Sequence, residues 1–359
     1  MSTAIGIGYG IMPALIANST RVRQQLDTLT EQASTGMVAQ TYAGLGSQSR
    51  VSLDLSPQIN ALQTYQTNIN QAVGGMQVTQ SAMTRIQQIA ATFVADIPNL
   101  NGLNSSEIDS VAANARSALS ETASLLNTKN GNTYVFGGQD TTNPPVPSSD
   151  SILSSGFYTQ INAAVSALSA NGAAATTAAT LALAGSNAPG TSPFSAYMSQ
   201  PSIVLSASQV QIGEGVTVQT GLLASGNVAA GSTGTSTTGS YMRDLMRALA
   251  TLGSMSSSQV NDPNFNALVL DTGNSLSDAV NAMATDVGVL GNTQASLTAT
   301  QSQLSATSTA LTSQVSSSRD VDMAATLSKL TAMQTQLQES YRLITSANSL
   351  SLINFLPNA

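Results

Sequence analysis

The feature that most constrains the fold is an apolar position that repeats every seven residues toward the C-terminal end of the chain. A second position follows it by four residues; it is apolar at Val280 and Val287 and polar at Gln294 and Gln301. This 4–3 spacing places both sets on one stripe of an α-helix, and such a stripe needs a partner to cover it. The repeating residues, which we expect in an intramolecular helix core, are Leu276, Met283, Leu290, Leu297, Leu304 and Leu311.

The N-terminal half offers a matching helix. Pro57 stands where a helix can begin and Pro98 where it must end, while the adjacent Gly74 and Gly75 favour a local kink or a close approach. We expect this helix to pair with the C-terminal one. Its core residues in the same heptad register are Leu62, Ile69, Met76 and Met83.

Two further helices are expected closer to the middle of the chain. One runs from about Ser106 to Asn127, with acidic residues in its first turn. The other begins at Tyr241 and carries Leu245, Ala248 and Leu252 on one face. Both would pack against the heptad helices.

The two ends of the chain carry weaker apolar stripes. A single amphipathic stripe is poorly stable alone, because most helix stability comes from tertiary packing. We therefore expect both ends to be disordered in the free monomer, to fold on assembly, and to form an interface between subunits. The predicted interface residues are Leu15, Val22, Leu26, Leu29, Leu330, Leu337, Tyr341, Ile344, Leu352 and Leu356.

The middle of the chain, residues 138–240, has a different composition, rich in Gly, Ser, Thr, Ala and Pro. Ser202–Ser206 and Gln209–Thr220 are typical of short strands, and Gly213-Glu214-Gly215 predicts a hairpin turn inside the second. The Ala-rich stretch Ala163–Ala184 is compatible with a helix or with disorder. These patterns predict a small β-containing insert.

The fold class that follows is mainly α, an elongated helical bundle or coiled coil formed by the N- and C-terminal halves with a small β-containing insert. Pairing across the insert would bring the termini together at one end of a rod. The expected parts are an N-terminal assembly helix and linker (1–57), the two halves of the rod (58–137 and 241–318), the insert (138–240) and a C-terminal assembly and export helix (319–359).

Composition argues against several function classes. The chain has no Cys and no His, which removes disulfides, thiolate nucleophiles, the common zinc sites and the usual general base. We expect no enzyme activity, no metal and no cofactor. The net charge is −7 and basic residues are scattered, so we expect no nucleic-acid partner. Only 8% of residues are charged, against about 25% in average domains. This favours a chain stabilised by helix packing and assembly.

Two local features have alternative interpretations. The apolar stretch Ala4–Ala17 resembles a signal peptide, but the first basic residue, Arg21, follows it, so we expect no cleaved signal. No apolar run reaches the ~18 residues that a membrane span needs, so no membrane insertion is expected. Asp320 and Asp322 beside Arg319 could suggest an acid pair or a metal site. A polar break followed by an acidic helix start is the better interpretation.

Four segments carry a resemblance to a known family. They are LDTLTEQASTG (Leu26–Gly36), LLNTKNGNTYVFGG (Leu125–Gly138), VQIGEGVTVQT (Val210–Thr220) and LQESYRLITSANSLSLINFL (Leu337–Leu356). Together they resemble the flagellin superfamily. The second and third are most similar to its hook–filament junction branch, a group of hook-associated proteins.

The resemblance implies a self-assembling structural subunit of the bacterial flagellum, secreted by the flagellar type III export apparatus without a cleaved signal. It implies an extracellular place at the hook–filament junction. The partners would be further copies in a ring or tube, a neighbouring hook-associated protein, filament flagellin and a cytoplasmic export chaperone.

Two alternatives stay open. Filament flagellin is the first, although AQTYAGLG (Ala39–Gly46) lacks the acidic residues usual after the first helix of that group. A secreted coiled-coil translocator or adhesin is the more distant one. It would need membrane-active segments or repeats, and the sequence has neither.

Overall fold

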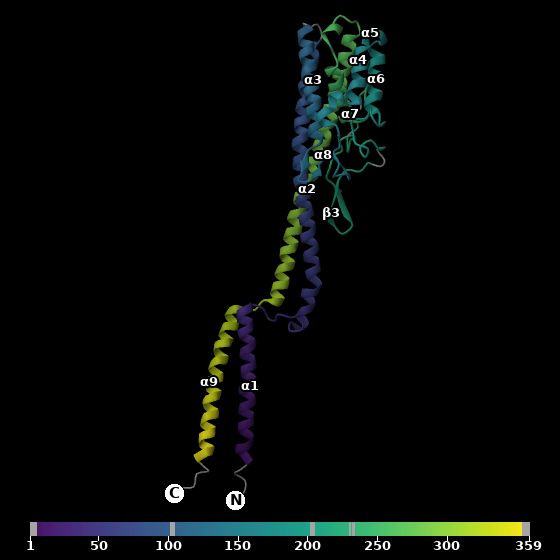
Figure 1. Cartoon of the computed structure of the whole chain (residues 1–359). Helices are drawn as coiled ribbons and strands as arrows, with labels where there is room; N and C mark the ends of the chain where they lie inside the picture. The colour runs from purple at the N-terminus through teal and green to yellow at the C-terminus, as the bar shows by residue number, and fades with distance from the viewer. Residues whose placement is uncertain (1–5, 101–104, 202–204, 230, 232–233, 354–359) are drawn as a thin grey trace. The chain divides into compact units, whose positions relative to one another are not determined.

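The computed structural model describes residues 6–100, 105–201, 205–229, 231 and 234–353. These residues are mainly α-helical, as predicted, with two small antiparallel sheets (Figure 1). The chain forms two compact units, one of residues 1–63 with 305–359 and one of residues 64–304. Helices α2 (Ser49–Asp96) and α8 (Phe265–Arg319) contribute residues to both units. The finer five-part division and the rod stay predictions.

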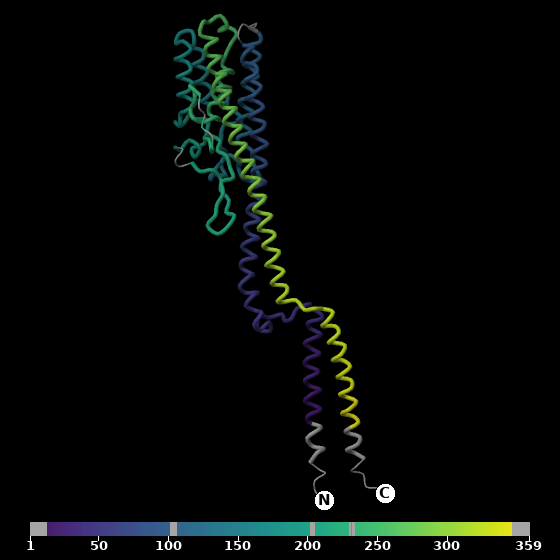
Figure 2. The backbone as a smooth tube through the Cα atoms, turned by 180° about the vertical axis from the view of Figure 1, so that it is seen from behind, coloured from purple at the N-terminus to yellow at the C-terminus, as the bar shows by residue number. Residues whose placement is uncertain are grey.

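The first unit is built around two long helices from opposite ends of the sequence. Helix α1 (Gly6–Thr35) and helix α9 (Met323–Ile353) lie side by side and run in opposite directions (Figures 1 and 2). A short 3₁₀ turn, η1 (Gly46–Gln48), precedes α2.

A backbone clasp fixes the point where the chain leaves α1 and enters α9. The amide of Val38 donates to the carbonyl of Arg319 at 2.7 Å, and the amide of Val321 donates to the carbonyl of Gly36 at 3.0 Å. Gly36 adopts a φ of 72°, a conformation that favours glycine after a helix. The clasp therefore holds the ends of α1 and α8 together.

The second unit contains the remaining elements. Helix α7 is its centre: it packs against α3, α4 and α6. The helices and turns are η2 (Ile97–Leu100), α3 (Ser105–Leu126), η3 (Ser149–Ser154), α4 (Gly156–Ser166), α5 (Leu168–Asn171), α6 (Ala173–Gly185), α7 (Tyr241–Gly253) and η4 (Ser257–Gln259). The strands are β1 (Lys129–Asn130), β2 (Thr133–Tyr134), β3 (Gln209–Gly213) and β4 (Val216–Gln219).

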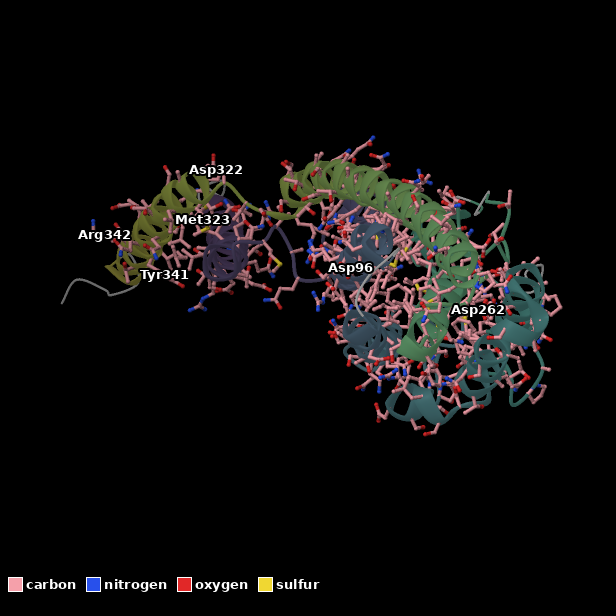
Figure 3. The ribbon with its side chains drawn as sticks, turned by 90° about the horizontal axis from the view of Figure 1, so that it is seen from above. Asp96, Asp262, Asp322, Met323, Tyr341 and Arg342 are labelled. Carbon is pink, nitrogen blue, oxygen red and sulfur yellow. The ribbon has the colours of Figure 1, made fainter. Side chains whose placement is uncertain are left out.

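Side chains of the helices in this unit share one hydrophobic core (Figure 3). The predicted heptad residues Ile69, Met76, Met83, Leu276, Met283, Leu290 and Leu297 are all buried in it. Leu304 is partly buried and packs against the core, and Leu62 and Leu311, which belong to the first unit, are also half-buried. The heptad stripe is thus covered over most of its length.

Two expectations about helices need correction. Helix α2 begins at Ser49, so Pro57 lies inside it. The proline removes one helical hydrogen bond, but Leu53, whose carbonyl loses its donor, is 51% exposed, so water can satisfy that carbonyl. Helix α2 continues through Gly74 and Gly75, and the kink or close approach expected there stays a prediction. Helix α7 is buried along its whole length, not on one face, because other helices cover it on several sides.

The insert is more helical than expected. The Ala-rich stretch forms the end of α4, then α5 and most of α6. The hairpin is present as predicted: β3 pairs antiparallel with β4, Val210 opposite Val218, and Gly215 in the turn has a φ of 69°. Of the predicted strand Ser202–Ser206, residues 202–204 lie outside the described residues, and Leu205 and Ser206 are not in a strand.

Candidate assembly surface

The seam between α1 and α9 is built from two heptad patterns that cover each other within one chain. On α1 the inward positions are Leu15, Ser19, Val22, Leu26, Leu29 and Ala33, and on α9 they are Thr326, Leu330, Met333, Leu337, Ser340 and Ile344. Val22, Ser19 and Thr326 are the most buried, at 7%, 7% and 6% exposure. A 4–3 spacing on both helices is the pattern that knobs-into-holes packing requires.

Most of the predicted interface residues lie on this α1–α9 seam. Tyr341 does not: it is 44% exposed. Leu352 belongs to α9, but its side chain, like the whole of Leu356, lies outside the described residues. A role of these residues in contacts between copies stays a prediction, as does disorder of both ends in the free monomer.

The pairing of α1 with α9 was difficult to predict from the sequence because polar residues lie on the seam. Ser19 and Thr326 occupy heptad positions and interrupt the apolar stripes. The hydroxyl of Ser19 is buried without a hydrogen-bond partner among the described residues. Reading these two positions as seam residues would have shown that each end helix carries a complete heptad stripe for the other.

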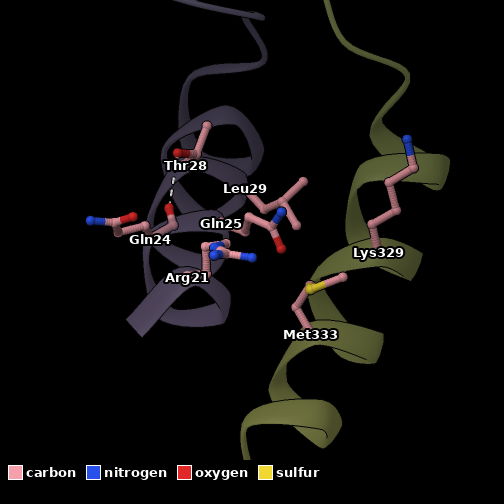
Figure 4. A pocket seen from close by; sticks show the side chains of 7 residues that line it. All are labelled: Arg21, Gln24, Gln25, Thr28, Leu29, Lys329 and Met333. Atoms are coloured by element: carbon pink, nitrogen blue, oxygen red, sulfur yellow. Dashed lines mark hydrogen bonds between the residues drawn. The ribbon is translucent and has the colours of Figure 1, made fainter. Parts of the chain in front are cut away.

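A groove opens on one side of the α1–α9 seam (Figure 4). Its volume is about 440 Å³. Both helices supply cations to it, and no carboxylate lines it. The lining residues are Arg21, Gln24, Gln25, Thr28 and Leu29 from α1, with Lys329 and Met333 from α9.

The acidic break before α9 is a helix cap. The carboxylate of Asp322 accepts hydrogen bonds from the amides of Ala324 at 2.9 Å and Ala325 at 3.0 Å. Amides of a first helical turn have no partner within the helix, so a carboxylate there stabilises the helix start. Asp320 pairs through its backbone with Met37. Among the described residues, no group of three or more potential ligands is placed to hold a metal ion.

Two segments far apart in the sequence meet in the second unit, next to the β3–β4 hairpin. The amide of Ala224 donates to the carbonyl of Phe136 at 3.1 Å, and the Ser208 hydroxyl donates to the carbonyl of Gly138 at 2.9 Å. A Cβ atom on Gly138 would lie 2.6 Å from the carbonyl oxygen of Ser206. The Phe-Gly-Gly sequence therefore lets the insert backbone approach this closely.

Buried charges on α7 fix the loop that precedes it. Arg243 donates to the carbonyls of Ala184 and Ser225, and Arg247 donates to the carbonyl of Ser236 at 3.1 Å. Burial lowers the pKa of both guanidinium groups, which remain charged at neutral pH. Sequence reasoning missed these residues because their acceptors lie in distant segments.

A buried carboxylate, Asp286 of α8, also binds this loop. Its carboxylate is 1% exposed and accepts from the amides of Val228 at 3.0 Å and Ala229 at 2.8 Å and from the Tyr241 hydroxyl at 3.0 Å. Burial, with the neighbouring carboxylate as a second cause, raises the pKa of Tyr241 well above its usual value. Tyr241 therefore stays protonated over the physiological pH range and donates a hydrogen bond to Asp286.

Comparison with known families identifies the two ends of the chain. Residues 11–141 match the N-terminal helical region of bacterial flagellin, and residues 274–356 match the C-terminal helical region. The chain belongs to the flagellin family. The two matches cover α2, α3, α9 and most of α1 and α8, so this family member keeps both terminal regions on either side of its own insert.

Among solved structures, this flagellin-family chain is similar to a protein assigned as a flagellar hook-associated protein from Vibrio parahaemolyticus. The sequences are 12% identical, the match covers 75% of this chain and 96% of that one, and the TM-score is 0.50. That likeness concerns the fold. No curated protein matches the sequence. None of the helices within the described residues has the length and hydropathy of a membrane span.

Proposed function

We propose that this flagellin-family protein is the hook–filament junction subunit of a bacterial flagellum. The family already makes it a structural subunit of the flagellum, since its members assemble into flagellar polymers. The junction role is the more specific part of the proposal. It includes an extracellular position between the hook and the filament, export through the flagellar type III apparatus and binding of a cytoplasmic chaperone before export.

The observation that carries the junction role is the pair of segments that meet beside the β3–β4 hairpin. LLNTKNGNTYVFGG and VQIGEGVTVQT resemble the junction branch, and the structure brings the end of one against the flank of the other through Gly138 and Ser208. The hook-associated protein whose fold is similar supports the same branch. Neighbouring hook-associated protein and filament flagellin are the partners that this position implies.

Filament flagellin is the second candidate. The observation that favours it is the match of both terminal regions, which junction and filament members of the family share. The two candidates differ in what a cell lacking the protein can still build.

A deletion strain tests the proposal. Loss of a junction subunit should leave hooks without filaments, with flagellin released into the medium, and the full-length gene should restore filaments. Hooks with filament subunit absent from cells and medium would instead identify this chain as the filament flagellin. Normal motile filaments in a strain with no second copy of the gene would contradict both.

A further inference from the structure

We infer that a buried water molecule joins α6 to α7 by binding the hydroxyl groups of Thr176 and Thr251. The inference concerns the second compact unit alone and does not depend on the junction role. It rests on two buried hydroxyls that have no protein partner and on the register in which the two helices pair.

Helices α6 and α7 pack directly against each other (Figure 1). Arg243 donates to the carbonyl of Ala184 at 2.9 Å. One turn further along α7, Arg247 donates to the Thr180 hydroxyl at 3.4 Å, and Thr180 lies one turn earlier on α6 than Ala184. Since the contacts advance along α7 as they go back along α6, the two helices are antiparallel.

The next step of this pairing joins two threonines. Thr251 follows Arg247 by four residues. Thr176 precedes Thr180 by four residues, so the register brings Thr176 and Thr251 to the same level within about one helical turn. Thr176, Thr180 and Ala184 are the buried residues of α6, which places Thr176 on the side of α6 that meets α7.

Thr251 lies on the side of α7 that meets α6. Gly253 marks the side against α3, because Arg116 donates to its carbonyl at 2.7 Å and a Cβ atom on Gly253 would lie 2.9 Å from Arg116 Cγ. Thr251 precedes Gly253 by two residues and so lies about 200° around the helix axis from it. It is only about 40° around the axis from Arg247, whose side chain reaches α6.

Both hydroxyls are buried, and neither has a hydrogen-bond partner among the described residues. Thr176 is 1% exposed and Thr251 is 0% exposed. The neighbouring Thr180 hydroxyl, in contrast, donates to the carbonyl of Thr177 at 3.0 Å. A buried hydroxyl that binds nothing destabilises a fold, and ordered water is a usual partner for such groups.

The surroundings suit water as the ligand. The Nε atom of Arg247 is a further buried polar atom without a partner among the described residues, on the same side of α7 as Thr251. Ala173 and Ala248, each three residues before one of the threonines, are small side chains that occupy little of the space between the helices. A buried water typically forms about three hydrogen bonds. The Thr176 and Thr251 hydroxyls and the guanidinium group offer that number of partners.

Valine substitutions test the shared water in urea unfolding of the full chain, because valine keeps the branched shape of threonine and lacks its hydroxyl. Thr176→Val or Thr251→Val alone should raise the equilibrium constant of unfolding about fivefold, since each leaves a buried hydroxyl with one partner fewer. The double variant should be at least as stable as either single variant, because both partners are then removed together. Single variants as stable as wild type, or effects that multiply in the double variant, would overturn the inference.

Thr79→Val is the matched control. Thr79 of α2 is 2% exposed, and its hydroxyl donates to the carbonyl of Gly75 at 2.9 Å within the same helix. Its effect should multiply with that of Thr251→Val, because sites without a shared partner act independently. If this pair failed to multiply as well, coupling between the two threonines could not be assigned to a shared water, and the inference would fail.

A crystal structure of the full chain that shows ordered water distinguishes a bridging water from a direct contact. Density within hydrogen-bond distance of the Thr176 and Thr251 hydroxyls in the wild-type chain, absent from the double valine variant, is the expected result. Coupled valine effects without such density would mean that the two hydroxyls bind each other, and would overturn the water site.

Discussion

Replacing Asp286 by asparagine should destabilise the second unit more than any comparable surface change. Among the described residues, the wild-type carboxylate accepts hydrogen bonds from the backbone amides of Val228 and Ala229 and from the Tyr241 hydroxyl. The asparagine side chain has one oxygen to accept them and places an NH₂ donor toward the remaining N–H or O–H groups. Leaving one or two donors unsatisfied costs about 1–3 kcal/mol each when they are buried. Because Ala229 is exposed and its amide can bind water, we expect a total loss of about 2–4 kcal/mol.

Urea unfolding of the purified full chain, followed by circular dichroism, measures this loss as a lower midpoint at similar slope. Hydrogen exchange should show faster opening of residues 225–240 than of the α2 core. Glu214→Gln, in the exposed β3–β4 turn, is the control and should stay within about 0.5 kcal/mol of wild type. A free energy of unfolding for Asp286→Asn as close to wild type as that control would refute the argument.

Three further changes test other parts of the fold. Because the pKa of Tyr241 is raised in the folded chain, its contribution to the free energy of unfolding should be complete below pH 10.0 and should fall as pH rises above it. In Tyr241→Phe, this part of the alkaline loss of stability should be absent from unfolding curves. Met83→Ala should cost about 2–5 kcal/mol in urea unfolding because Met83 is fully buried, whereas Met323→Ala, at an exposed site, should cost less than about 0.5 kcal/mol; equal effects would contradict the assigned core. Gln301→Leu removes a solvent-exposed 2.6 Å hydrogen bond to α2 and should change stability by no more than about 1 kcal/mol, so a larger loss in thermal unfolding would show that this bond sets the helix register.

Local and periodic features of the fold could be predicted from the sequence. The turn at Gly213-Glu214-Gly215 is determined by adjacent residues, and the hairpin forms where the pattern places it. Helix α3 begins within one residue of its predicted start, and the heptad residues from Leu276 to Leu297 are buried. Seven-residue spacing over five or six repeats leaves one stripe for the core, so tertiary context has little to alter.

Features that depend on distant segments could not be predicted. Arg243 and Arg247 look like the solvated side of an amphipathic helix, and only the loop and α6 that cover them make them interior residues. The position of Pro57 inside α2 also depends on tertiary structure. The proline is tolerated there because Leu53, whose carbonyl loses its helical donor, is exposed to water.

The same limit applies to the candidate assembly surface. The heptad residues of α1 and α9 predict an interface between subunits. Periodicity alone does not say whether the partner helix belongs to the same chain or to another copy. The structure supplies that partner within the same chain, because α1 packs against α9.

The most direct test of the junction role is to locate the protein on intact flagella. Glu214→Cys introduces one thiol in the exposed β3–β4 turn of an otherwise cysteine-free chain, where a maleimide-coupled gold particle can label it. The account predicts gold in a single narrow band between hook and filament in electron micrographs of a motile complemented strain. Gold distributed along the whole filament would contradict it and identify the chain as a filament subunit.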